Sequence, residues 1–211
     1  MRADDAGAAH RIPVAPPNLL PDLPMDALSA AAFGVVLAAC AGLRAFLPLF
    51  SASVAVHLYP LALPDALRWL ERPEAMVLFG VATLLEILGD KVPIVDHLLD
   101  SVQVFTKPAL AALAATPFLY QLAPEHAAAI AIVVGAPLAL GVHATKATAR
   151  AGSTVTTGGL GNPVLSLVED VAAVCAVIVG FLAPLIALAL TLFLLFVLVR
   201  FALRVRRRRR A

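Results

Sequence analysis

Long stretches rich in Ala, Val, Leu and Ile alternate with short polar segments along most of this chain. The apolar stretches cover about 28–47, 74–88, 108–122, 126–147, 163–181 and 184–203, and they lack the period-2 alternation of strands. A helix needs about 20 apolar residues to cross the hydrocarbon of a bilayer, where it satisfies its own backbone hydrogen bonds. We therefore predict an all-α fold, a polytopic transmembrane helical bundle of about six spans.

The segment after the first span interrupts this regular order. Residues 51–63 are apolar but too few to cross a bilayer comfortably, and they lie among Pro48, Pro60 and Pro64. They predict a re-entrant or interfacial piece, or the continuation of a long helix broken at Pro48. Residues 65–74 include Trp69 and predict an interfacial loop or a short amphipathic helix.

Composition agrees with a membrane protein. The chain is 61% hydrophobic and 14% charged, with a mean hydropathy of +0.92, whereas a soluble domain carries about 25% charged residues. The net charge of +2 gives no reason to expect a nucleic-acid partner. Arginine instead gathers at Arg204 and Arg206–Arg210, directly after the last apolar stretch. This placement predicts a cytoplasmic anchor on anionic lipid headgroups, and six spans then put both termini in the cytoplasm.

Three regions follow from these boundaries. Residues 1–27 hold several prolines among small and polar residues and predict a disordered cytoplasmic tail, without the apolar core of a signal peptide; Met25 is an alternative start. Residues 28–204 form the transmembrane domain, and residues 205–211 form a basic cytoplasmic tail. The expected partners are the lipid bilayer and, as an open option, a second copy of the chain. Cys40 and Cys175 fit neither a disulfide framework nor a metal-ligand spacing.

Ionisable residues within or at the ends of the apolar stretches are the candidates for function. An Asp, Lys or Arg at the centre of a membrane helix costs roughly 2.5–3.5 kcal/mol on insertion, so such residues usually pair with one another, line water or handle a substrate. The candidates for binding an ion or substrate are Arg44, Glu86, Asp90, His143, Lys146, Arg150, Glu169 and Asp170.

Two pairs of carboxylates have helical spacing. Glu86 and Asp90 lie four residues apart at the end of the second span, and Asp96 and Asp100 repeat that spacing beyond it. Paired carboxylate oxygens suit a hard divalent cation such as Mg²⁺ or Ca²⁺, and Asp96 and Asp100 are the candidate metal ligands. The alternative is a solvated cytoplasmic loop in which Lys91 and Lys107 neutralise part of the acidic charge.

The fourth and fifth spans carry complementary charge. His143, Lys146 and Arg150 have the spacing i, i+3, i+7, which puts them on one stripe of a helix. This stripe is a partner for acidic residues or for a phosphate or carboxylate, or it anchors the span at the cytoplasmic side. Glu169 and Asp170 lie about 10 Å into the fifth span, and we expect one or both to turn inward toward the stripe.

Arg44 is expected to stand apart from the other charges. The orientation inferred from the arginine-rich end puts it near the outer end of the first span, where it either snorkels to the interface or occupies a break. Gly42 and Pro48 flank it and mark a weak point in that helix. Broken helices with buried charge are typical of transporters.

The motifs GLRAFLPL, EILGDKVPIVD, HATKATAR and NPVLSLVED together resemble an uncharacterised family of bacterial integral-membrane proteins known only as a domain of unknown function. The resemblance covers about Gly34 to Phe181 and implies a place in the bacterial inner membrane, without an activity. The string EILGDK is also similar to the E-x-G-D-K signature of cation/proton exchangers that export manganese or calcium. It differs by one extra residue before Gly89 and by Val92 in place of a hydroxyl residue.

These observations leave three hypotheses. The first is a small transporter or channel that moves an ion or small polar solute through the buried carboxylates and bases. The second is a membrane enzyme acting on lipid headgroups at the cytoplasmic face, with a divalent cation held by Asp96 and Asp100 as its cofactor. The third is a scaffold or assembly factor whose charges only hold helices together. No fuller catalytic motif supports the enzyme, so the transporter is preferred.

Overall fold

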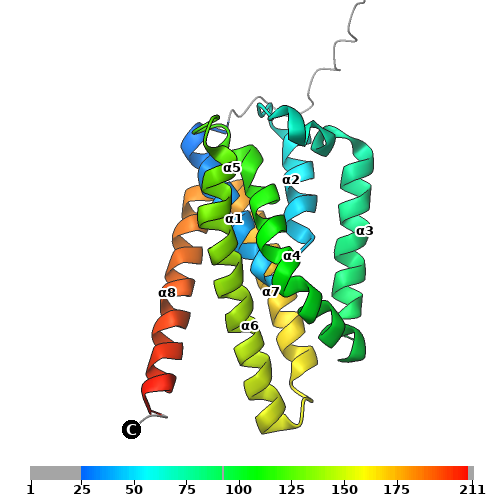
Figure 1. Cartoon of the computed structure of the whole chain (residues 1–211), viewed down its shortest axis with the longest axis vertical. Helices are drawn as coiled ribbons and strands as arrows, with labels where there is room; N and C mark the ends of the chain where they lie inside the picture. The colour runs from blue at the N-terminus through cyan, green and yellow to red at the C-terminus, as the bar shows by residue number, and fades with distance from the viewer. Residues whose placement is uncertain (1–24, 92, 209–211) are drawn as a thin grey trace, which may run out of the picture.

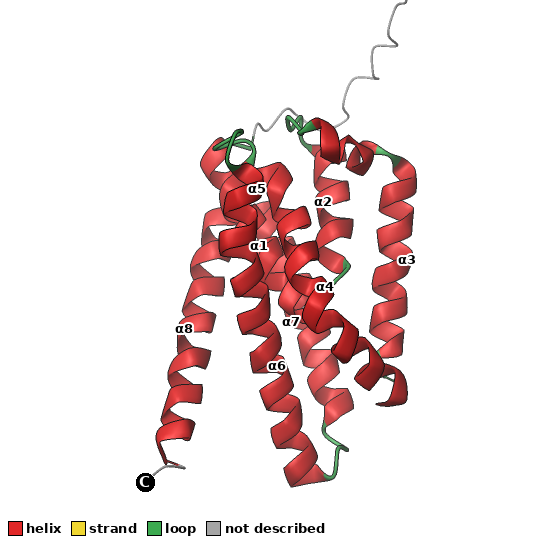
Figure 2. Cartoon of the chain, in the orientation of Figure 1, coloured by secondary structure: helices red, strands yellow, loops and turns green. Residues whose placement is uncertain are grey.

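A computed structural model describes residues 25–91 and 93–208, and this part of the chain folds entirely into helices joined by turns (Figure 2). The elements in chain order are α1 (Ala27–Leu43), α2 (Leu47–Leu58), η1 (Asp65–Glu71), α3 (Pro73–Gly89), α4 (Pro93–Leu119), α5 (Ala127–Ile130), η2 (Ala131–Gly135), α6 (Ala136–Thr157), α7 (Asn162–Leu182) and α8 (Pro184–Arg208). The expected all-α fold is confirmed. Residues 1–24 of the predicted tail lie outside the described residues, and α8 continues through residues 205–208 of the predicted basic tail.

Helices α1 and α2 form a hairpin that enters the bundle and returns (Figure 1). The aromatic rings of Phe33, in the second turn of α1, and Tyr59, just after α2, both contact Phe181. The start of α1 and the end of α2 therefore lie close together, and the junction between the two helices lies inside the bundle. The structure therefore excludes one alternative for the segment after the first span, a single long helix that continues across Pro48, because the chain breaks between Leu43 and Leu47 and turns back.

The hairpin changes the count of crossings and the direction of the chain. Helices α3, α4, α6, α7 and α8 run from one end of the bundle toward the other, but α1 and α2 do not (Figure 1). The expected six spans are not confirmed. The start of α1 and the end of α8 lie at opposite ends of the bundle, so the expectation of both termini on one side disagrees with this course of the chain.

Helix α4 corrects the loop that was expected before Pro108. The helix begins at Pro93 and continues through Pro108 and Pro117. Each proline removes one backbone hydrogen bond, which transmembrane helices tolerate because neighbouring groups satisfy the freed carbonyls. Lys107 consequently lies inside a helix, where it is fully buried, rather than in a solvated loop.

Helix α1 is the centre of the bundle, and small residues let its neighbours approach it closely. It packs against α4, α6, α7 and α8. A Cβ atom at Gly34 would come within 3.0 Å of Ala115 O in α4, and one at Gly42 would come within 2.5 Å of Ala139 O in α6. Close backbone approach at small residues is typical of helix packing in membranes. It also brings the end of α1 beside the basic stripe of α6.

The molecule has charged side chains inside and large apolar side chains outside, the reverse of the distribution in a soluble protein. Large apolar side chains on α3, α7 and α8 face outward, including Leu85, Val168 and Phe193. Among the described residues, three helical segments are long and apolar enough to cross a membrane by length and composition, namely Ser101–Leu119, Ala127–Thr157 and Asn162–Leu182. The second of these is continuous through α5, the π-helical turn η2 and α6. These features agree with the predicted membrane protein.

Candidate functional site

The break between α1 and α2 is the structural origin of the site. Helix α1 ends at Leu43, and Arg44 has an extended backbone, with φ −128° and ψ 120°. Pro48 lies in the first turn of α2, where its ring would clash with the carbonyl of residue 44 if the helix were continuous. The break therefore exposes helix ends within the bundle, and their free backbone groups need partners.

A carboxylate binds the amino-terminal end of α2. Glu86 of α3 accepts hydrogen bonds from the backbone N–H groups of Ala45, at 2.8 Å, and Phe46, at 3.1 Å. The side-chain amide of Gln103 in α4 donates to the same carboxylate at 2.7 Å. A negative charge at this position also complements the positive end of the α2 dipole.

An ammonium group binds the carboxyl-terminal end of α1. Lys107 Nζ lies 3.0 Å from Gly42 O and 3.5 Å from Leu43 O. The same nitrogen lies 3.0 Å from Nδ1 of His143 in α6. The two ends of the broken helix thus receive charges of opposite sign, each matched to its dipole.

Arg44 joins three helices at the break. Its Nη1 atom pairs with Asp90, the residue just after α3, and its Nη2 atom pairs with Asp170 of α7. Nη2 also lies 3.3 Å from Ser166 Oγ, one turn before Asp170. The expectation that Arg44 stands apart is therefore wrong, because the hairpin returns the end of α1 into the same charged cluster.

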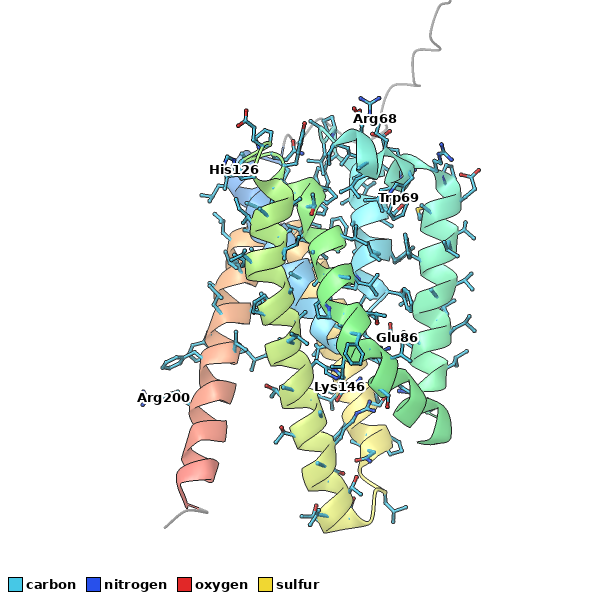
Figure 3. The ribbon with its side chains drawn as sticks, in the orientation of Figure 1. Arg68, Trp69, Glu86, His126, Lys146 and Arg200 are labelled. Atoms are coloured by element: carbon cyan, nitrogen blue, oxygen red, sulfur yellow. The ribbon has the colours of Figure 1, made fainter. Side chains whose placement is uncertain are left out.

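The basic stripe of α6 meets the acids of α3 and α7. Lys146 Nζ is 3.4 Å from both Asp90 Oδ2 and Glu169 Oε2. Arg150 Nη2 is 2.9 Å from Glu169 Oε2 and 3.3 Å from Asp90 Oδ2. The predicted stripe and the inward turn of the α7 acids are confirmed, and Figure 3 shows Lys146 and Glu86 in the body of the bundle, away from Arg68 and His126 at one end.

The cluster becomes less buried toward one edge. The Arg44, Asp90 and Lys146 side chains are each only 1% exposed, whereas that of Asp170 is 11% exposed. Lys91, just after α3, donates to Asp170 Oδ2 and Ser166 Oγ at 2.8 Å, and its side chain is 36% exposed. Lys91 therefore marks the edge at which the cluster meets its surroundings.

The structure brings all eight predicted binding residues into one connected region. They are Arg44, Glu86, Asp90, His143, Lys146, Arg150, Glu169 and Asp170. The sequence reasoning missed Gln103 and misplaced Lys107. Gln103 and Lys107 lie four residues apart, which would put them on one face of a helix, but Pro108 indicated that the helix starts only after them.

The candidate metal site receives no support within the described residues. Helix α4 includes Asp96 and Asp100, but their side chains lie outside the described part of the structure. Among the side chains that are described, no group of three or more His, Cys, Asp or Glu is arranged to hold a metal ion. Asp90, which was paired with Glu86 as a possible cation site, faces three basic groups instead.

Residues 31–204 match the model of a family described as a domain of unknown function (DUF4126). No curated protein and no solved structure matches the chain. The match confirms the resemblance to an uncharacterised family that the motifs indicated.

Proposed function

We propose that this chain, which belongs to the DUF4126 family of unknown function, is a membrane transporter or channel that moves an ion or small polar solute through the charged site at the α1–α2 break. We further propose that it lies in the bacterial inner membrane with the arginine-rich end of α8 in the cytoplasm. The charged edge at Lys91 then faces the cytoplasmic side, because the end of α3 and the end of α8 lie at the same end of the bundle (Figure 1).

The observation that carries the proposal is a helix broken within the bundle with charged side chains bound to both of its ends. Irregular backbone at membrane depth is tolerated only where it is buried in protein or lines a path for a polar solute. Secondary transporters place their binding sites at such discontinuous helices, where helix termini and free carbonyls contact ions and substrates. Glu86 and Lys107 contact the corresponding groups here.

The ion pairs also supply groups that can exchange partners. Arg44 contacts two carboxylates, and Asp90 contacts three basic side chains. A charged solute competes with one of these groups for its partner, and the displaced group keeps another partner within reach. Such rearrangement needs no fully unpaired charge in a low-dielectric interior, which would be strongly unfavourable.

A scaffold is the second candidate, because the same pairs bind α1, α3, α6 and α7 to one another. Variants with Asp90→Asn, His143→Ala or Asp170→Asn separate the two functions. A transporter loses activity in cells even when the variant reaches normal levels in the membrane. A scaffold restores a deletion phenotype whenever the variant is folded.

Accessibility labelling tests for a transport path directly. In a chain with Cys40→Ala and Cys175→Ala, a single cysteine is introduced by Ser166→Cys, next to Arg44, and treated with a membrane-impermeant thiol reagent in vesicles of each orientation. We expect labelling from both sides, since the site must open to each side in turn. The matched control is Val168→Cys, which is 59% exposed on the apolar outer face and should react from neither. Labelling of position 166 from one side only contradicts a transport path.

A further inference from the structure

We propose that the carboxyl-terminal end of α1 is a monovalent-cation site that the chain fills with its own ammonium group, that of Lys107. This inference deepens the proposed function, and its consequence for the ion dependence of transport rests on that function. Transport through the break then proceeds without Na⁺ or K⁺ bound at this helix end. The site itself is a property of the fold and is testable without any transport assay.

The groups around Lys107 Nζ are those that a cation requires. The last four carbonyls of a helix have no partner within it, and they carry the negative end of its dipole. Gly42 O and Leu43 O are two of these carbonyls, and they lie 3.0 Å and 3.5 Å from Lys107 Nζ. In broken transporter helices, carbonyls in this position coordinate Na⁺ or a proton.

Helix α6 contributes a further acceptor. His143 Nδ1 lies 3.0 Å from Lys107 Nζ. An ammonium group has only donors, so the imidazole must offer the lone pair of Nδ1 and carry its proton on Nε2. The contact exists because α1 and α6 touch at Gly42, where a Cβ atom would lie 2.5 Å from Ala139 O and 2.5 Å from Val142 Cβ. The residue next to Val142 in α6 is His143.

Lys107 is fully buried at the site. It is 0% exposed, and its ammonium group contacts two carbonyls at a helix end and an imidazole. A buried ammonium group is costly unless its surroundings are built for it. The carbonyl and imidazole acceptors fit a compact positive charge, which a small metal cation also supplies.

The test replaces the ammonium group in two ways that differ in the space they leave. Lys107→Ala removes the charge and opens room beside the two carbonyls, whereas Lys107→Met removes the charge and keeps the volume filled. Each full-length variant and the wild type are purified and unfolded thermally, with the fluorescence of Trp69, the single tryptophan, as the signal. Solutions contain NaCl, KCl or choline chloride at equal ionic strength.

We expect Lys107→Ala to be less stable than wild type in choline chloride and to regain stability in Na⁺ or K⁺. Once the cation concentration exceeds the dissociation constant, the midpoint should rise by about 3–5 °C for each further tenfold increase. Lys107→Met and wild type should show no such difference between the salts.

Three results overturn the inference. The first is an equal midpoint for Lys107→Ala in choline and in the metal salts, and the second is a metal-specific rise in Lys107→Met or in wild type. The third is failure of both Lys107→Ala and Lys107→Ser to fold even in NaCl and KCl, because a bound cation should rescue them.

The outcomes also separate this inference from the proposed function. If labelling at position 166 occurs from one side only while Lys107→Ala still binds Na⁺, the transport proposal fails and the cation site stands. If labelling occurs from both sides but wild type is stabilised by Na⁺, the transport proposal stands and the filled cation site is refuted.

Discussion

Removal of the Arg44 guanidinium is the most direct test of the charged site. Arg44→Met keeps an unbranched side chain of similar reach but leaves Asp90 and Asp170 without their shared partner. Loss of one member of a buried ion pair typically costs about 3–5 kcal/mol, because the other charge stays buried. Here the carboxylates keep other basic partners, so the low end of that range applies, about 3 kcal/mol.

That loss of stability is measurable as a change in the unfolding midpoint. For a chain of 150–250 residues, 1 kcal/mol lowers the midpoint by about 2–4 °C, so Arg44→Met should lower it by about 6–12 °C. The matched control is Arg68→Met, since Arg68 pairs with Asp65 at the surface with side chains 68% and 90% exposed. An exposed pair contributes about 0–1 kcal/mol, which predicts a change below about 4 °C.

A second substitution tests the assigned cause. Asp170→Asn in the Arg44→Met background removes one of the stranded carboxylates, so the double variant should be more stable than the sum of the two single effects by about 0.5–3 kcal/mol. Strict additivity of the two effects, or an Arg44→Met midpoint no lower than that of Arg68→Met, would show that stranded carboxylates are not the cause.

The remaining predictions concern single contacts. Glu86→Gln leaves one oxygen for the N–H groups at the start of α2 and should lower the free energy of unfolding by about 1–3 kcal/mol, as measured by denaturant titration. An unchanged denaturation midpoint would show that the Glu86 carboxylate does not stabilise this end of α2. Gly42→Ala should lower the free energy of unfolding by about 1–3 kcal/mol, because the new Cβ atom would lie 2.5 Å from Ala139 O. The control, Gly141→Ala in α6, should be neutral or slightly stabilising, because nothing lies within 4 Å of its Cβ position. Equal effects of the two substitutions would show that the α1–α6 contact is not tight. Hydrogen bonds from Ser29 hold the pKa of Asp26 below the ordinary value of an aspartate side chain. The pKa of Asp26 is lower in the folded than in the unfolded state, so its contribution to stability is fully present above the unfolded-state pKa and is lost as the pH falls through the folded-state pKa. The difference in unfolding midpoint between wild type and Asp26→Asn should shrink over that range, and a constant difference would exclude the hydrogen bonds between Ser29 and Asp26 as its source.

Much of the secondary structure was predictable because it depends on local properties of the chain. The apolar stretches from 74, 163 and 184 correspond to α3, α7 and α8, which begin at residues 73, 162 and 184. The spacing of His143, Lys146 and Arg150 correctly placed these side chains on one face of α6. In contrast, Pro108 predicts a helix start by its sequence pattern, but α4 passes through it. A proline ends a helix in water, but within a bundle neighbouring helices compensate for the lost hydrogen bond.

Single segments of the chain were enough to predict a helical bundle with long apolar stretches and costly charges inside, because hydropathy, helix period and the cost of burying charge act along a single segment. The sequence also identified most of the charged residues of the site. The packing of the helices decided that Lys107, and also Arg44, a candidate that was expected to stand apart, contact these residues. That decision depends on α1 and α2 folding back as a hairpin, which is set by packing between segments distant in sequence, such as Phe33 and Tyr59 against Phe181. A local pattern carries no information on such contacts.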